Sequence, residues 1–94
     1  MNMQAQQMFL KAGLLMTYGA PLVELDKIAN DLLGLSPRVA ARKAAAGQLP
    51  FPVIQLGSSQ KSPKFVNLEH LAEWLESLSK ESKAEFKAMN TDYS

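Results

Sequence analysis

The sequence predicts a mainly helical fold with a small β-hairpin, namely a winged helix-turn-helix with an added N-terminal helix and a long C-terminal helix. Three observations predict it. A capped helix pair meets at residues 34–37, two short apolar runs flank a polar loop after Pro52, and long helical patterns lie at both ends of the chain. A chain of 94 residues suits one compact core, so we expect a single domain over residues 1–94.

The N-terminal helix is expected over residues 4–18, which contain strong helix formers and no proline. Apolar residues recur there at helical spacing, at Met8, Phe9, Ala12, Leu15 and Met16. Leu10 and Leu14 widen the apolar face beyond one stripe. This width suggests that the helix is covered on two sides, by its own domain and by a partner chain. Gly19 is expected to end the helix.

A helix pair is expected next, after an extended piece at residues 21–23. The first helix covers residues 25–33, and Gly34 suits its C′ position, where a left-handed residue closes a helix. Ser36 is a suitable N-cap for the second helix, which begins at Pro37 and runs to about Ala46. The short connection predicts a tight helix-turn-helix.

A β-hairpin is expected to complete the unit that spans residues 21–66. The prolines within residues 48–52 end helical structure and turn the chain. Residues 53–56 and 65–66 are then interpreted as two short strands, and the polar residues 57–64 as the loop between them. We expect this hairpin to form the wing.

The C-terminal helix is expected over residues 67–88, with Asn67 as its N-cap. Its inner face is expected to contain Leu68, Leu71, Ala72, Leu75 and Leu78, with Trp74 beside it. Further along, Ser82, Phe86 and Met89 prolong the stripe. This extension either packs against a partner helix or is a solvated tail, and residues 89–94 are expected to be disordered.

Charge is segregated along the chain, although the net charge is only +1. The balance is −1 over residues 1–31, +5 over residues 32–68 and −3 over residues 69–94. The middle segment contains both arginines of the protein and no acidic residue. Because this basic segment coincides with a capped helix pair and a hairpin, it favours DNA binding over the alternative of an ordinary solvated face.

Base readout is assigned to the helix that begins at Pro37. Arg38 and Arg42 are one turn apart and project from one face, where the small Ala41 allows close approach. A guanidinium fork matches the acceptors of guanine in the major groove. Lys43 lies further around the helix and is expected to contact a phosphate, as is Ser36 at the helix N-terminus.

The wing is expected to contact the DNA backbone or the minor groove. Its candidate residues are Ser58, Ser59, Gln60, Lys61 and Lys64. Phe51 and Trp74 are interpreted as packing around the wing, with a wedge of Phe51 against DNA as the alternative.

The composition excludes several kinds of site. The chain has no cysteine and one histidine, so disulfides, thiolate sites and a zinc ligand set are excluded. His70 is expected at the surface, and Glu69, Glu73 and Glu76 are interpreted as solvated helical charges away from the apolar stripe rather than as catalytic acids. We therefore expect no enzyme activity, no metal and no cofactor.

The N-terminal apolar stretch does not predict a membrane span. Residues 8–16 are interrupted by Lys11 and are too few to cross a bilayer, and no basic leader precedes them. We expect a cytoplasmic protein without a membrane partner.

The sequence also resembles the pyocin activator protein (PrtN) family, small phage- and bacteriocin-associated transcription regulators, from Phe9 to about Leu78. The resemblance is carried by 14–16, 18–19, 21–25, 34–37, 42–50, 56–57, 59–61 and 71–72. It is most specific at Arg-Lys-Ala-Ala-Ala-Gly-Gln-Leu-Pro over 42–50, followed by Ser-Gln-Lys over 59–61. The resemblance implies an excisionase- and MerR-like winged helix that activates bacteriocin genes from upstream DNA elements. Residues 1–8 are a departure, because the N-terminus is longer than expected for the family.

These observations predict a sequence-specific DNA-binding transcription regulator, an activator of bacteriocin or prophage genes. One alternative is an excisionase-like architectural factor that bends DNA for site-specific recombination. Another is a protein-interaction adaptor that uses the terminal helices. The expected partners are double-stranded DNA, RNA polymerase and further copies of the chain, which would associate through the N- or C-terminal helices.

Overall fold

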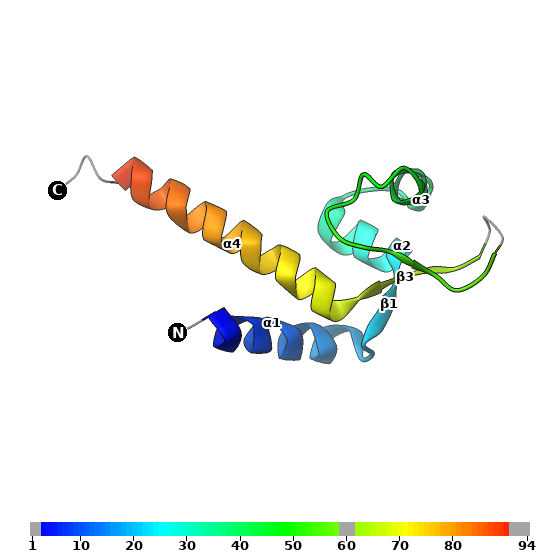
Figure 1. The fold of residues 1–94 in the computed structure, drawn as a ribbon, viewed down its shortest axis with the longest axis horizontal. Helices are drawn as coiled ribbons and strands as arrows, with labels where there is room; N and C mark the ends of the chain where they lie inside the picture. The colour runs from blue at the N-terminus through cyan, green and yellow to red at the C-terminus, as the bar shows by residue number, and fades with distance from the viewer. Residues whose placement is uncertain (1–2, 59–61, 91–94) are drawn as a thin grey trace.

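The computed structural model describes residues 3–58 and 62–90, which form a mainly helical fold with a small antiparallel sheet (Figure 1). The elements are α1 (Met3–Tyr18), β1 (Leu22–Glu24), α2 (Leu25–Ile28), the π-helical segment η1 (Ala29–Leu33), α3 (Pro37–Ala45), β2 (Ile54–Gln55), β3 (Lys64–Asn67) and α4 (Leu68–Asn90). Helices therefore occupy the regions where the sequence predicted them. No helix in the described part of the chain is long and apolar enough to cross a membrane.

The sheet has three strands in the order β1-β3-β2, one more than predicted. The hairpin prediction is confirmed, because β2 and β3 pair antiparallel with Ile54 opposite Phe65. β2 is shorter and β3 longer than expected. The segment at 21–23 was interpreted only as an extended lead-in, but β1 pairs along the other edge of β3, with Val23 opposite Val66. The sheet thus ties the start of the helix pair to the hairpin.

The core lies between the helix pair, the sheet and the first turns of α4. Its completely buried side chains come from distant parts of the chain and include Ile28, Ala40, Val66 and Leu71. Burial of these apolar groups is the main force that fixes α3 on α2 and the sheet. Phe51 is only 6% exposed and meets the ring of Trp74 edge to face, at 5.4 Å between ring centroids. The packing interpretation of Phe51 is therefore confirmed.

The predicted caps define the helix pair. Gly34 has φ 65° and closes η1, and Gly47 has φ 66° just after α3, a conformation that costs glycine little. The Ser36 Oγ accepts a hydrogen bond from the Val39 N–H at 3.3 Å, which is the expected N-cap. At the start of α4, the Asn67 Oδ1 accepts from the Glu69 N–H at 2.8 Å.

Helices α1 and α4 lie side by side and run in opposite directions, with α1 at the bottom of the view in Figure 1. An ion pair joins them, with 3.7 Å between Lys11 Nζ and Glu69 Oε1. Leu14 and Tyr18 pack against the core, so this side of α1 faces the domain. The stripe formed by Met8, Phe9, Ala12, Leu15 and Met16 is exposed on the outer side.

Two predictions of solvent exposure on α4 were wrong. Glu76 was expected to be solvated, but it is only 3% exposed, because the packing of α1 along α4 buries a wider arc than the apolar stripe. His70 was expected at the surface but is half-buried, with its Nδ1 atom enclosed. Glu69 and Glu73 are exposed as expected.

The end of α4 is longer than predicted. Residues 89 and 90 belong to the helix, which corrects the expectation of disorder at these two positions, since helical hydrogen bonding continues past residue 88. The remaining residues of that expectation, 91–94, lie outside the described part of the chain. Phe86 and Met89 are exposed.

Candidate nucleic-acid interface

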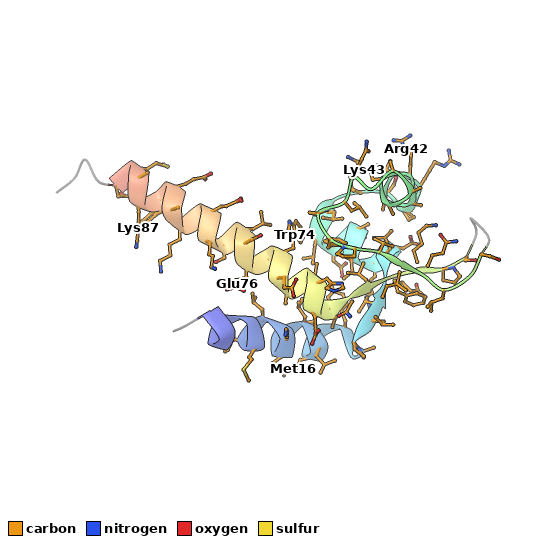
Figure 2. The ribbon with its side chains drawn as sticks, in the orientation of Figure 1. Met16, Arg42, Lys43, Trp74, Glu76 and Lys87 are labelled. Carbon is orange, nitrogen blue, oxygen red and sulfur yellow. The ribbon has the colours of Figure 1, made fainter. Side chains whose placement is uncertain are left out.

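The two arginines project from one exposed face of α3. Arg38 and Arg42 are exposed, one turn apart, and Lys43 beside them is half-buried. Figure 2 shows Arg42 and Lys43 pointing away from α1 and α4. Ala40 is completely buried and faces the opposite way, into the core. The side chains of α3 therefore separate into a core face and a basic face.

A hollow surface connects this basic face with the hairpin. One groove lies between the start of α3 and the hairpin, and its lining includes Arg38, Ala41 and Lys64. A second groove lies next to it and is lined by Ala41, Arg42, Ala45, Gln55 and Lys64. Ala41 and Lys64 line both grooves. The fold thus brings together four predicted site residues from two separate segments, namely Arg38, Ala41, Arg42 and Lys64.

Three further predicted site residues, Ser36, Lys43 and Ser58, are described but line neither groove. Ser36 is exposed at the N-terminus of α3, where its Oγ caps the helix, and Lys43 is half-buried next to Arg42. Ser58 is exposed in the hairpin loop. The predicted contacts by Ser59, Gln60 and Lys61 fall outside the described residues.

The basic groups on α3 are not neutralised by ion pairs within the described part of the chain. Neither the Lys11–Glu69 nor the Lys80–Glu76 ion pair involves a residue of α3. Arg38 and Arg42 therefore have no carboxylate partner among residues 3–58 and 62–90. A guanidinium in this state retains its donors for an external acceptor such as a guanine edge or a phosphate.

Residues 32–68 contain no acidic residue, but the surface that they form in the folded protein is joined by an acidic residue from α2. Asp26, in the first turn of α2, lines the first groove together with Arg38. Ser62 and Pro63 also line it and were not among the predicted site residues. No local signal indicated Asp26, because the short connection joins the end of η1, not the first turn of α2, to the start of α3. No group of three metal-ligating side chains occurs among the described residues.

Tyr18 connects α1 to the helix pair. Its hydroxyl donates to Asp31 Oδ2 at 3.0 Å, and the Nζ of Lys27 lies 5.7 Å from the centre of its ring. Burial, followed by the hydrogen bond to Asp31 and the charge of that carboxylate, raises the pKa of Tyr18 above the ordinary 10.0. This contact therefore fixes the end of α1 to α2 and η1.

Comparison with known proteins identifies a family. A family model described as pyocin activator protein PrtN matches residues 11–84. The match includes the helix pair, all three strands and parts of α1 and α4. It confirms the resemblance carried by the sequence motifs. No curated protein and no solved structure matched the chain.

Proposed function

The chain belongs to the pyocin activator protein family, and from this membership we propose that it binds DNA sequence-specifically and activates pyocin or related prophage genes. In this proposal the helix pair and the β2–β3 hairpin act as a winged helix-turn-helix. α3 enters the major groove and the hairpin lies over the adjacent backbone or minor groove.

The observation that carries the proposal is the shared groove of α3 and the hairpin. Arg38 and Arg42 offer planar forks for base edges, and Ala41 between them leaves room for the helix to approach the groove floor. Lys64 borders both hollows from the hairpin side, as a phosphate contact would require. Ser36, Lys43, Ser58, Ser59, Gln60 and Lys61 are proposed as further backbone contacts.

The direct test is binding to duplexes from the upstream regions of the associated pyocin or prophage genes, measured by fluorescence anisotropy over a salt series. We expect Arg42→Ala to weaken binding to the preferred duplex by about 1–3 kcal/mol and to reduce its preference over unrelated duplexes. Lys61→Ala should weaken binding to all duplexes alike and make the salt dependence less steep. Lys87→Ala is the matched control, because Lys87 lies at the far end of α4 (Figure 2).

Equal affinity of the unmodified protein for every duplex would contradict sequence-specific binding. An Arg42→Ala effect no larger than that of Lys87→Ala would contradict the assignment of α3. Strong bending of the duplex with several copies side by side would favour the architectural alternative.

A further inference from the structure

The outer side of α1 is an apolar surface that nothing in the described part of the chain covers. Met8, Phe9 and Met16 are exposed by 68%, 76% and 86% of their surface, and Leu15 is about half exposed. Figure 2 shows Met16 pointing away from α4, on the side of the molecule opposite Arg42. Exposed apolar side chains gathered on one helix face are typical of a protein interface. We call Met8, Phe9, Ala12, Leu15 and Met16 the outer stripe.

The outer stripe has the same order of side-chain sizes in both directions. Two large residues, Met8 and Phe9, precede the small Ala12, and two large residues, Leu15 and Met16, follow it at matching intervals. In a two-fold antiparallel pair centred on Ala12, Met8 of one copy meets Met16 of the other and Phe9 meets Leu15. Every large residue of the stripe then contacts another apolar residue of the stripe, so the surface is complementary to itself.

The electrostatics of α1 also fit a second copy. Lys11 is the only charged residue of α1, and it is turned toward α4, where it pairs with Glu69. Two outer stripes therefore meet without like charges and without burying an unpaired charge. The flexible thioethers of Met8 and Met16 adapt readily to such a contact.

A groove adjoins the outer stripe at the end nearer to β1. It is lined by the apolar Leu15, Pro21 and Leu68 together with Asn67 and the Lys11–Glu69 ion pair. In an antiparallel pair of α1 helices centred on Ala12, Phe9 of one copy lies opposite Leu15 of the other, at the mouth of this groove. The symmetric contact thus offers each Phe9 ring a receiving surface.

We propose that the outer stripe joins two copies of this chain as an antiparallel α1–α1 pair centred on Ala12. Met8 and Phe9 lie outside the residues matched by the family model, so the interface is assigned from this chain's own residues. One helix face is smaller than the about 800 Å² per partner of a standard interface, so we expect a dissociation constant on the order of 10 μM.

The first test is solution mass by sedimentation across protein concentrations from about 1 to 500 μM, a range that brackets the expected constant. We expect Phe9→Glu to raise the dissociation constant of the dimer about tenfold or more, because it buries an unpaired carboxylate. Phe86→Glu is the matched control, since Phe86 is an exposed phenylalanine on α4, and it should leave the dimer intact. Thermal unfolding followed by circular dichroism checks that both variants remain folded.

The second test uses the absence of cysteine from the chain. Ala12→Cys places one thiol at the proposed two-fold axis, and we expect mild oxidation to cross-link it into a dimer. Met8→Cys alone should not cross-link, because in the antiparallel pair its two copies lie about 12 Å apart along the helices. A mixture of Met8→Cys and Met16→Cys should give the cross-linked heterodimer, since these positions lie opposite each other.

Three results would overturn the proposal. They are a monomer throughout the concentration range, a dimer abolished by Phe86→Glu but not by Phe9→Glu, and efficient cross-linking of Met8→Cys with itself, which indicates parallel helices. All three readouts are independent of DNA, so they leave the proposed regulatory function standing.

Discussion

At the scale of single residues, Tyr18 is the polar contact that ties α1 to the helix pair. Its hydroxyl donates to Asp31, so Tyr18→Phe should lower the free energy of unfolding by about 1 kcal/mol near pH 8. The folded-state pKa of Tyr18 is raised above the ordinary 10.0, so the neutral form stabilises the fold. This contribution is complete below pH 10 and is lost as the pH rises through the raised folded pKa.

The measurement is chemical unfolding of the wild type and Tyr18→Phe between pH 8 and pH 11. We expect the difference in unfolding free energy between them to shrink above pH 10, while the other titrating groups affect both proteins alike. A difference that stays constant over the whole range would show that the hydroxyl does not act through its titration.

Replacement of Glu76 should also change the free energy of unfolding measurably. Glu76 is buried between α4 and α1, and its Oε1 atom accepts no hydrogen bond from a described residue, while the Nζ of Lys80 lies 3.8 Å away. An unsatisfied buried oxygen costs about 1–3 kcal/mol, whereas an i,i+4 ion pair contributes less than about 0.5 kcal/mol. We therefore expect Glu76→Leu to raise the free energy of unfolding by about 1 kcal/mol.

Urea unfolding of this variant measures the effect, with Glu73→Leu as the exposed control. Glu73 is solvated on the same helix, so its replacement should change stability by less than about 0.5 kcal/mol. Destabilisation by Glu76→Leu would contradict the prediction, because it would mean that the buried carboxylate stabilises the fold.

At the scale of elements, two substitutions at the N-cap of α3 should affect stability and DNA affinity differently. Ser36→Ala removes the acceptor of the Val39 N–H and should cost about 1 kcal/mol of stability. Ser36→Asp retains a capping oxygen and favours the helix dipole, so its stability should remain close to that of the wild type. It also places a negative charge beside Arg38, so its DNA affinity should fall more than that of Ser36→Ala.

Thermal unfolding and anisotropy measured on the same three proteins check this prediction. If Ser36→Asp binds DNA as tightly as the wild type, the N-terminus of α3 does not face the phosphates.

The elements that could be predicted from the sequence are those with local signals. Gly34, Ser36, Gly47 and Asn67 define helix ends through hydrogen bonds to residues within a few positions, so these ends were predicted correctly. The third strand, β1, depends on pairing with a strand more than forty residues later, for which three residues give no recognisable pattern.

The site divides in the same way. Arg38, Ala41 and Arg42 share a helix face by spacing alone, whereas the approach of Lys64 and Asp26 depends on how the hairpin and α2 pack. For α1, periodicity revealed a wide apolar surface but not which side faces the domain, because both sides are apolar. The burial of Glu76 has the same origin, since it depends on where α1 lies along α4.

At the scale of the whole molecule, the shape is elongated, with a Cα radius of gyration of 15.7 Å against about 12 Å for a compact domain of this length. The end of α4 extends beyond the start of α1 and presents Phe86 and Met89 to solvent (Figure 1). The extension is therefore helical in the single chain, whether it packs against a partner helix or remains solvated.

The opposite placement of the outer stripe and the basic face predicts how a dimer would engage DNA. Met16 and Arg42 point to opposite sides of the molecule in Figure 2, so joining two copies through α1 turns their α3 helices away from each other. Such a dimer does not fit two adjacent half-sites on one face of a duplex, which require recognition helices about 34 Å apart facing the same way. We expect it to bridge two duplex segments instead.

A capture assay tests this geometry, with one duplex immobilised and a second, labelled duplex in solution. We expect the wild type to retain the labelled duplex at concentrations where it is dimeric. Phe9→Glu should bind each duplex singly and retain none, and Arg42→Ala should weaken both steps. Cooperative binding of two wild-type copies to adjacent sites on one duplex, with no capture of the second, would contradict the outward arrangement, because the two basic faces would then have to lie on the same side of the dimer.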